Sequence, residues 1–242
     1  MYTVLSWCVF VAVGGPVALA FLQQQQQQWK DAHIASLTAF SPPFGGSTDT
    51  IKSIISGNNL GISVVSHAIF WPIQSTCASG VWLLPVPTAS DGGGWSDDEV
   101  VLSDASHVYT ARNVTLAFAN RGLQQAVDID AAGVRNISLR NFDAPGVAVN
   151  VLRGTGVKTE VGYEYAGSFS SFAPNTPMKP PAVVRWGDGD GTVPNRSLAR
   201  AERWDQEQQQ SVRFRVFEGA THIGILSNKD ALGELVHFLE EP

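Results

Sequence analysis

The chain has 242 residues, of which 44% are hydrophobic and 16% charged, and its formal net charge at pH 7 is −6. This composition indicates a globular protein with ample core and excludes a disordered chain. The negative charge and the absence of a basic stretch exclude nucleic acid as an expected partner. Cys8 and Cys77 either pair in an oxidising compartment or remain buried thiols, and no metal-ligand spacing surrounds them.

The first 22 residues carry no charged side chain and allow two interpretations. Ala18-Leu19-Ala20 is similar to a signal-peptide cleavage site, and the segment just reaches the length of a membrane anchor. Against this, no Lys or Arg precedes the apolar run, and Gly14-Gly15-Pro16 interrupts it. We therefore predict a strand over Val4–Val13, a glycine turn, and a helix over Val17–Gln28 that ends in a run of glutamines.

A short buried strand is predicted over His33–Phe40, followed by a Pro- and Gly-rich loop over Ser41–Gly46. From residue 47 to about residue 141 the pattern is irregular, with a Trp- and Pro-rich stretch at Phe70–Pro87 and a glycine-rich stretch at Ser90–Asp98. Such a stretch between core strands indicates a cap inserted into the sheet, and not a second independent fold.

Strand composition returns at Val147–Arg153, Val161–Tyr165, Ala182–Trp186 and Val212–Phe217. Ser227-Asn228-Lys229-Asp230 has the spacing of a capping box, and a helix with one apolar face follows it. The chain is thus predicted to have three parts. They are residues 1–46 with a strand, helix and second strand, residues 47–145 as the cap, and residues 146–242 with the returning strands and a closing helix.

Two of these strands lead into glycine loops that carry an acid and a base. One loop is Gly187-Asp188-Gly189-Asp190-Gly191, and the other is Glu218-Gly219-Ala220-Thr221-His222. An α/β-hydrolase presents its acid and then its base in this way, on loops after core strands. The acid holds the base, and the base takes the proton of a serine hydroxyl. We predict Asp190 as the acid and His222 as the base.

A calcium loop is the first rival interpretation of the Asp190 segment. An EF-hand aligned on Gly191 would have Trp186 first and Ser197 last, and neither is a suitable ligand. A plain Asp-Gly turn remains an alternative. We expect no metal or other cofactor.

The nucleophile position of this fold has alanine where serine belongs. The fold places its nucleophile first in the chain, on a strand–turn–helix written G-x-S-x-G. The matching segment places Ala12 at the serine position, and the N–H of Val13 would be one oxyanion donor. Ser6, the nearest serine, lies inside the apolar run and has no neighbouring glycine. A glycine turn before an ordinary helix is the alternative.

Taken in order, these segments resemble the lecithin:cholesterol acyltransferase family, including its lysosomal phospholipase A branch. The resemblance implies an α/β-hydrolase fold, of which this chain holds the C-terminal part of the sheet with an inserted cap. It implies Asp190 and His222 as acid and base. Because the family's serine falls on Ala12, we expect a truncated or mis-started member in which residues 1–13 are not family sequence. The segments that carry the resemblance are Gly14-Gly15-Pro16, Trp29-Lys30-Asp31, Pro43-Phe44-Gly45-Gly46-Ser47, Ser56-Gly57-Asn58-Asn59-Leu60-Gly61, Trp82-Leu83-Leu84-Pro85, Asp98-Glu99-Val100, Ala144-Pro145-Gly146-Val147, Asp190-Gly191-Thr192-Val193 and the His222 loop.

The resemblance also implies an activity: acyl transfer or phospholipase A-type hydrolysis of a phospholipid through an acyl-serine intermediate. The acyl acceptor would be a sterol, another alcohol or water. Without the serine we expect this chain alone to be inactive, and a catalytically dead fragment or a lipid- or partner-binding pseudoenzyme is the alternative. The cap residues Phe70, Trp71, Trp82 and Leu83 would contact lipid, although each is equally consistent with an ordinary core position.

Family members act in the secretory pathway, the lysosome or vacuole, or outside the cell, which implies the same for this chain. A membrane or lipoprotein surface is the implied partner, and a monomer is expected. Three glycosylation sequons fit such a location: Asn113-Val114-Thr115, Asn136-Ile137-Ser138 and Asn195-Arg196-Ser197.

Overall fold

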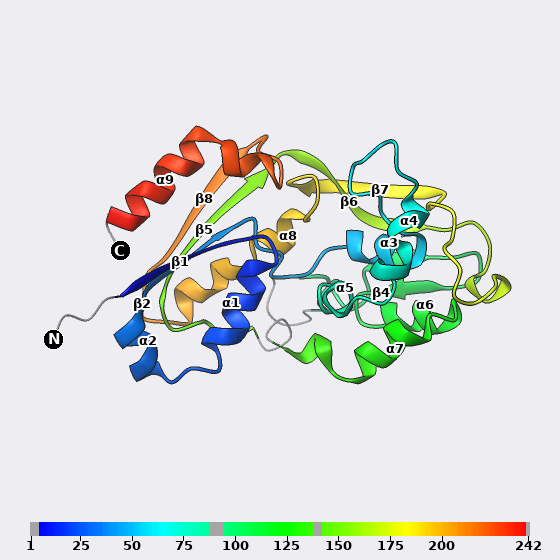
Figure 1. Cartoon of the computed structure of the whole chain (residues 1–242), viewed down its shortest axis with the longest axis horizontal. Coiled ribbons are helices and arrows are strands. Elements are labelled where there is room, and N and C mark those ends of the chain that lie inside the picture. Colours follow the sequence, from blue (N-terminus) through cyan, green and yellow to red (C-terminus); the bar gives the residue numbers. More distant parts are fainter. Residues whose placement is uncertain (1–4, 88–93, 138–141, 241–242) are drawn as a thin grey trace. The chain divides into compact units, whose positions relative to one another are not determined.

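The computed structural model describes residues 5–87, 94–137 and 142–240 (Figure 1). Two compact units make up the chain. The core unit comprises Met1–Gly45, Asn141–Thr159 and Asp188–Pro242, and the inserted unit comprises Gly46–Arg140 and Glu160–Gly187. The inserted unit therefore takes in residues 160–187, which the sequence had grouped with the returning strands.

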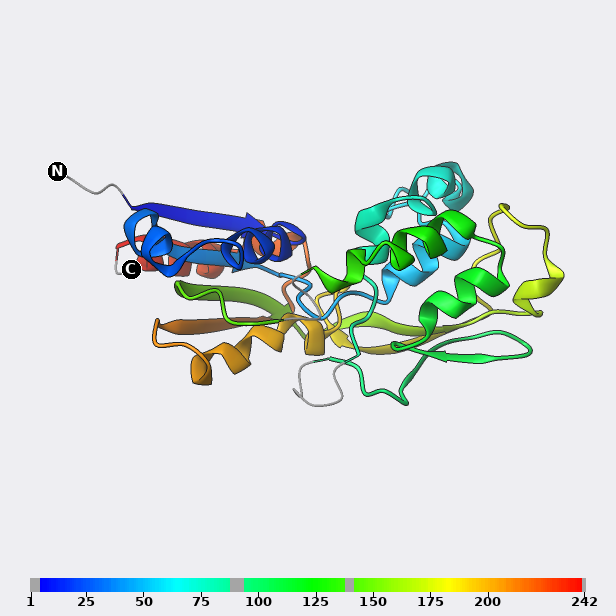
Figure 2. The same ribbon diagram turned by 90° about the horizontal axis from the view of Figure 1, so that it is seen from below.

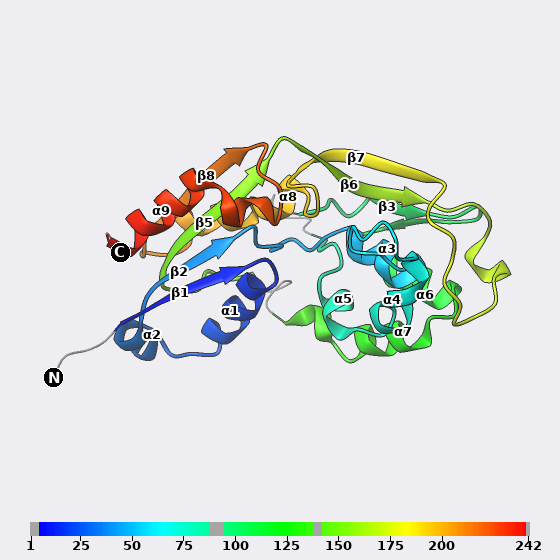
Figure 3. The ribbon, with the colours of Figure 1, turned by 45° about the horizontal axis from the view of Figure 1, so that its top comes forward.

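The core unit is built on a parallel sheet with the strand order β1-β2-β5-β8. All four strands point toward the same edge of the sheet (Figure 3). Their positions confirm the strands predicted from residue composition. Their bounds are β1 Ser6–Val11, β2 Ile34–Phe40, β5 Ala148–Thr155 and β8 Val212–Glu218.

Helices cover both faces of this sheet. On one face, Leu19 of α1 (Gly14–Leu22) packs with Ala39 and Val151. On the other face, Phe238 of α9 (Lys229–Glu240) packs with Phe40. This alternation follows from the pleat of a strand, which directs successive side chains to opposite faces. The remaining helical segments of the unit are α2 Gln27–His33, α8 Asn195–Leu198, η3 Arg200–Gln206 and η4 Gly224–Ser227.

The predicted helix over residues 17–28 is wrong, because the glutamine run separates two helices. α1 ends at Leu22 and α2 begins at Gln27. Gln23 donates a hydrogen bond to the Asp143 carbonyl at 3.1 Å, and Gln27 donates to the Gly146 carbonyl at 2.7 Å. These long-range bonds favour a break that the helix propensity of glutamine does not predict.

The inserted unit has its own sheet and its own hydrophobic core. The sheet order is β4-β3-β6-β7, and β6 and β7 each extend into the core unit. The helices of the unit lie on one side of the sheet (Figure 2). Trp95, Tyr109, Phe118 and Tyr163 are among the wholly buried residues between the layers. The irregular sequence pattern therefore corresponds to a compact α/β unit with short elements.

The strands of the inserted sheet are β3 Val100–Ser103, β4 Val108–Thr110, β6 Val157–Glu164 and β7 Val183–Gly189. Its helical segments are α3 Asp49–Ser56, α4 His67–Gln74, α5 Ala78–Trp82, α6 Val114–Asn120, α7 Gln124–Ala131, η1 Val134–Asn136 and η2 Phe169–Ser171. Cys8 and Cys77 are free thiols. Within residues 5–87, 94–137 and 142–240, no helix has both the length and the apolarity to cross a membrane.

The closing helix α9 begins at Lys229, one residue later than a cap at Ser227 would place it. The cap is Asn228, whose Oδ1 accepts the N–H groups of Asp230 and Ala231, both at 3.0 Å. Ser227 instead donates its hydroxyl to the Gly224 carbonyl at 3.0 Å, inside the preceding turn of η4. The predicted helix is confirmed, and the predicted serine cap is wrong.

Replacing the cap tests this assignment. Asn228→Ala leaves two N–H groups of α9 without their acceptor and should lower the free energy of unfolding by about 1 kcal/mol. The matched change Ser227→Ala removes an exposed hydroxyl and should cost less than about 0.5 kcal/mol. Urea unfolding measures both, and a larger loss for Ser227→Ala would contradict the assignment.

Candidate active site

The strand-to-helix turn predicted around Ala12 is present in the core unit. β1 ends at Val11, α1 begins at Gly14, and the φ angle of Ala12 is 48°. This left-handed conformation is uncommon for a residue with a Cβ and marks a strained turn. The Ala12 N–H donates to the Phe40 carbonyl at 2.9 Å, which ties the turn to the end of the neighbouring strand β2. The backbone has the form of a nucleophile elbow.

Close packing explains the glycine that follows the turn. A Cβ added to Gly15 would lie 2.8 Å from the Cβ of Pro42, which is closer than two non-bonded carbon atoms approach. α1 therefore packs directly against the loop after β2. This contact and the backbone bond of Ala12 both hold the turn in place.

Asp190 and His222 form a hydrogen-bonded pair. Oδ2 of Asp190 lies 2.7 Å from Nδ1 of His222, which confirms the predicted contact between the two loops. A second bond joins the same residues through the backbone, because the His222 N–H donates to the Asp190 carbonyl at 2.7 Å. The carboxylate holds Nδ1, so Nε2 is the ring nitrogen able to exchange a proton with a reacting group.

The carboxylate of Asp190 is wholly buried, and its other oxygen is also occupied. Oδ1 accepts the N–H groups of Thr192 at 3.0 Å and Val193 at 2.8 Å. A buried carboxylate is costly without such partners. The Asp190 loop is thus shaped around its own carboxylate, and this fixes the direction in which Oδ2 meets the imidazole.

Two further residues hold the Asp190 loop and were not identified from the sequence. Thr159, which is fully buried, accepts the Gly191 N–H at Oγ1 at 2.8 Å. Asp188 accepts the Gly156 N–H at 2.7 Å and the Thr155 hydroxyl at 2.8 Å. These three bonds link Asp188, near the end of β7, and Gly191, in the loop after it, to residues 155–159. No local sequence pattern predicts these hydrogen bonds, since they join residues about thirty positions apart.

The close approach of the two loops depends on Gly154 in β5. A Cβ at this position would lie 2.0 Å from the Ala220 carbonyl oxygen and 3.2 Å from the Cβ of Asp190. Only glycine leaves room for both loops at once. Gly154 therefore acts as a spacer that lets the acid and the base meet.

The four cap residues predicted to contact lipid have different environments within the inserted unit. Trp71 is 8% exposed, belongs to the hydrophobic core and donates its indole N–H to the Ile54 carbonyl at 2.9 Å. It occupies the core position that was the alternative. Phe70, Trp82 and Leu83 are half-buried, and the Trp82 indole donates to the Ile137 carbonyl at 2.9 Å.

An exposed apolar segment lies close to these residues in the chain and was missed. Leu60, Ile62, Val64, Ile69 and Ile73 each expose between 45% and 91% of their surface. Residues 59–73 contain no Asp, Glu, Lys or Arg, and that uncharged run is the sequence signal that would have identified them. We call these five residues the apolar segment. Among the described residues, no cluster of three or more His, Cys, Asp and Glu side chains suits a metal ion.

The parallel sheet, the elbow and the Asp–His pair define an α/β-hydrolase-type fold. The family model for lecithin:cholesterol acyltransferase matches residues 8–141 and 131–229. The chain belongs to this family.

Two relatives illustrate the match. The lysosomal phospholipase A and acyltransferase of Rattus norvegicus is 30% identical over 96% of this chain and 52% of its own length. The phosphatidylcholine-sterol acyltransferase of Gallus gallus is 30% identical over 89% of this chain and 49% of its own length. The chain spans about half the length of the curated relatives it matches.

A solved structure supports the fold. A chain of the crystal structure of the Tle4–Tli4 complex aligns with a TM-score of 0.57 at 12% identity, covering 95% of this chain and 58% of that chain. At this identity the likeness concerns the fold alone.

The role of Gly154 is testable with a matched pair of glycine substitutions. Gly154→Ala should lower the free energy of unfolding by about 1–3 kcal/mol through overpacking. It should also weaken the proton NMR signal of the hydrogen bond between Asp190 and His222. Gly233→Ala in α9, where an added Cβ meets no atom within 4 Å, should instead stabilise by about 0.5–1 kcal/mol. A Gly154→Ala protein with unchanged stability and an unchanged signal would refute the spacer role.

Proposed function

We propose that this chain carries the acid–base pair of a lipid acyl-ester site, of the kind used by phospholipases A and lipid acyltransferases. The hydrogen bond between His222 and the buried Asp190 carries the proposal. The names of the relatives, a phospholipase A and acyltransferase and a phosphatidylcholine-sterol acyltransferase, supply the substrate class. The substrate is then a phospholipid, and the acceptor a sterol, another alcohol or water.

In the proposed reaction, a serine hydroxyl at position 12 attacks the ester carbonyl while Nε2 of His222 takes its proton. Asp190 keeps the ring in the required tautomer and stabilises the imidazolium. The N–H of Val13, at the start of α1, donates to the oxyanion. His222 then returns the proton to the leaving lysophospholipid, and the acceptor attacks the acyl-serine in a second cycle of the same steps.

This chain has Ala12 at that position, which supports a second candidate: a protein that binds a lipid ester without turning it over. A methyl group supplies neither nucleophile nor proton. Loss of a triad member leaves only about 10³–10⁴-fold acceleration over water in a well-studied protease, from the oxyanion donors and binding. The chain as it stands is therefore expected to be inactive.

Labelling with a fluorophosphonate separates the base from the missing nucleophile. The unaltered chain should neither be labelled nor release fatty acid from phosphatidylcholine. Ala12→Ser should gain covalent labelling, and the double variant Ala12→Ser, His222→Ala should lose it, because an unactivated serine reacts slowly. Turnover by Ala12→Ser should stay low, because each oxyanion donor contributes about 10²–10³ in rate and the N–H of Val13 is the single donor assigned among the described residues.

Three results would contradict the proposal. Fluorophosphonate-sensitive turnover by the unaltered chain would contradict its inactivity. Labelling of Ala12→Ser that is unchanged by His222→Ala would contradict the role of His222. A well-folded Ala12→Ser protein that is not labelled at all would contradict the elbow assignment, and circular dichroism establishes the folding.

We further propose that the apolar segment meets the lipid surface, together with the half-buried Phe70, Trp82 and Leu83. Soluble proteins rarely expose several large aliphatic side chains within one short stretch. The segment carries no charge, so its attraction to lipid would come from burial of apolar surface and would not need anionic lipid. Trp71 is excluded from this role by its core position.

A double substitution tests the proposed lipid surface. Val64→Ser with Ile73→Ser removes the two most exposed members and should reduce partition to phosphatidylcholine vesicles about tenfold, given about 0.8 kcal/mol per buried methylene. Val108→Ser, which alters a valine that is 63% exposed on β4, is the matched control and should leave partition unchanged. Equal partition of all three proteins in vesicle sedimentation would refute the surface.

The lysosomal relative also motivates a location, and we propose the secretory pathway or the lysosome. Asn113 is exposed and accepts the Thr110 N–H at 2.7 Å at the turn before α6. It is the sequon best placed for a glycan. Asn195 is half-buried and bonded to Arg153, and Ser138 of the remaining sequon lies outside the described residues.

A further inference from the structure

A pocket of about 730 Å³ lies at the amino ends of the four parallel strands of the core unit. Ala12 and His222 follow the carboxyl ends of β1 and β8, so the pocket is at the opposite edge of the sheet from the proposed acyl-ester site. Its volume falls within the range of small-molecule sites. A ligand could bind in this pocket without taking part in the proposed acyl-transfer reaction.

Small side chains next to an indole produce the hollow. The pairing of the strands places Trp7 beside Ser36, and Ser36 beside Ala148, on one face of the sheet. Trp7 and Ala148 line the pocket with Ile34 and Ser211. Bulky residues in place of Ala148 and Ser211 would fill this space. Trp7 keeps 46% of its surface exposed, which leaves an aromatic wall for a ligand.

The wall on the other side is held by buried and backbone-directed side chains. Lys30, only 8% exposed, donates its ammonium to the Pro145 carbonyl at 2.8 Å. Gln208 accepts the Gly146 N–H at 2.9 Å and donates to the Val147 carbonyl at 2.8 Å. Gln27 donates to the Gly146 carbonyl. These bonds fix residues 145–147 before any ligand arrives, and a preformed wall reduces the entropy lost on binding.

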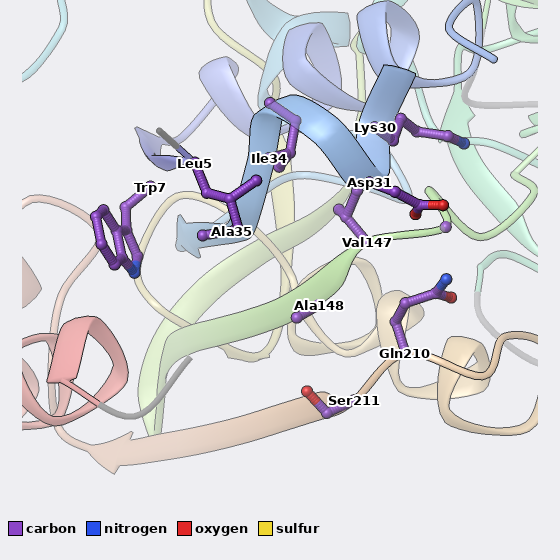
Figure 4. A pocket seen from close by; sticks show the side chains of 11 residues that line it. Leu5, Trp7, Lys30, Asp31, Ile34, Ala35, Val147, Ala148, Gln210 and Ser211 are labelled. Carbon is purple, nitrogen blue, oxygen red and sulfur yellow. The ribbon is translucent and has the colours of Figure 1, made fainter. Parts of the chain in front are cut away.

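The charged group offered to a ligand is the carboxylate of Asp31. In the close-up, Trp7 lies on one side of the hollow and Asp31 and Gln210 on the other, while the Lys30 ammonium is directed away (Figure 4). Gln27 donates to Oδ1 of Asp31 at 2.7 Å and so orients the carboxylate. The pocket thus has an aromatic and aliphatic end and a polar end, where the Asp31 carboxylate is exposed and the Lys30 ammonium is bonded to the Pro145 carbonyl. Neighbouring strands are about 4.8 Å apart, so β1 and β5, which lie on either side of β2, are about 10 Å apart.

We propose that this pocket binds an elongated organic cation, with its apolar body against Trp7 and Ile34 and its ammonium group at Asp31. An aromatic or alkyl body matches the first end, and a positive head matches the second. Gln210, on the same side of the hollow as Asp31, adds a hydrogen-bonding group near the head.

Calorimetric titration with phenylbutylamine, phenylbutanol and phenylbutyrate tests the proposal, because the three share one body and differ in head charge. The amine should bind about two- to fivefold more tightly than the alcohol, as expected for one exposed ion pair. The carboxylate should bind most weakly. Added salt should reduce the difference in affinity between the amine and the alcohol.

Substitutions locate the binding. Asp31→Asn should abolish the preference for the amine, and the exposed Asp205→Asn is the matched control that should keep it. Trp7→Ala should weaken the binding of all three ligands. Ser211→Phe, which fills the hollow from an exposed position, should abolish binding without altering Asp31.

The proposal is overturned if no ligand binds at millimolar concentration, or if the three bind equally. It is also overturned if the preference for the amine persists in Asp31→Asn or if Ser211→Phe binds as the unaltered protein does. Circular dichroism of each variant establishes that it is folded. The reference protein is the unaltered chain, and every variant also keeps Ala12.

Discussion

The buried carboxylate of Asp190 is the constraint on which the candidate active site depends. Removing a carboxylate from water is costly unless each oxygen is hydrogen-bonded, and here two backbone N–H groups and the His222 ring supply those bonds. The loop can present its N–H groups in this way because Gly191 adopts a φ angle of 90° and its own N–H is held by Thr159. The position of His222 is therefore a consequence of how the acid is accommodated.

The turn at Ala12 illustrates how backbone contacts alone can hold a strained conformation between a strand and a helix. Strained backbone conformations usually occur at functional sites, where the surrounding structure maintains them. In this chain the turn is maintained by the bond from Ala12 to the Phe40 carbonyl and by the packing of Gly15 on Pro42. Neither contact needs a hydroxyl. The family's fold can therefore persist with alanine at the turn.

A parallel sheet gives the core unit two chemically different edges. Loops that follow the strands meet at the carboxyl edge, which is where open α/β sheets place their reactive groups. At the amino edge, the turns before β2, β5 and β8 leave a hollow between Trp7 and the segment of residues 145–147. Gln27, whose bond to the Gly146 carbonyl helps to stiffen this hollow, is also one of the two glutamines whose long-range bonds favour the break between α1 and α2. The bond from Gln27 to Gly146 thus contributes to both the broken helix and the preformed wall.

The sequence by itself determined the strands of the core unit, the order of the acid and base loops and the turn at Ala12. These features follow from local patterns of apolar residues and glycine, which act within a few positions of each other. Only the tertiary structure decided that Asn228 caps α9, that Trp71 lies in a core and that Gly154 and Thr159 support the Asp–His pair. The last two depend on contacts between residues distant in the chain, while the choice of cap depends on where η4 ends. Burial and close approach of that kind arise only when the layers pack, because side-chain volume and hydrogen-bond geometry are then satisfied jointly and not residue by residue.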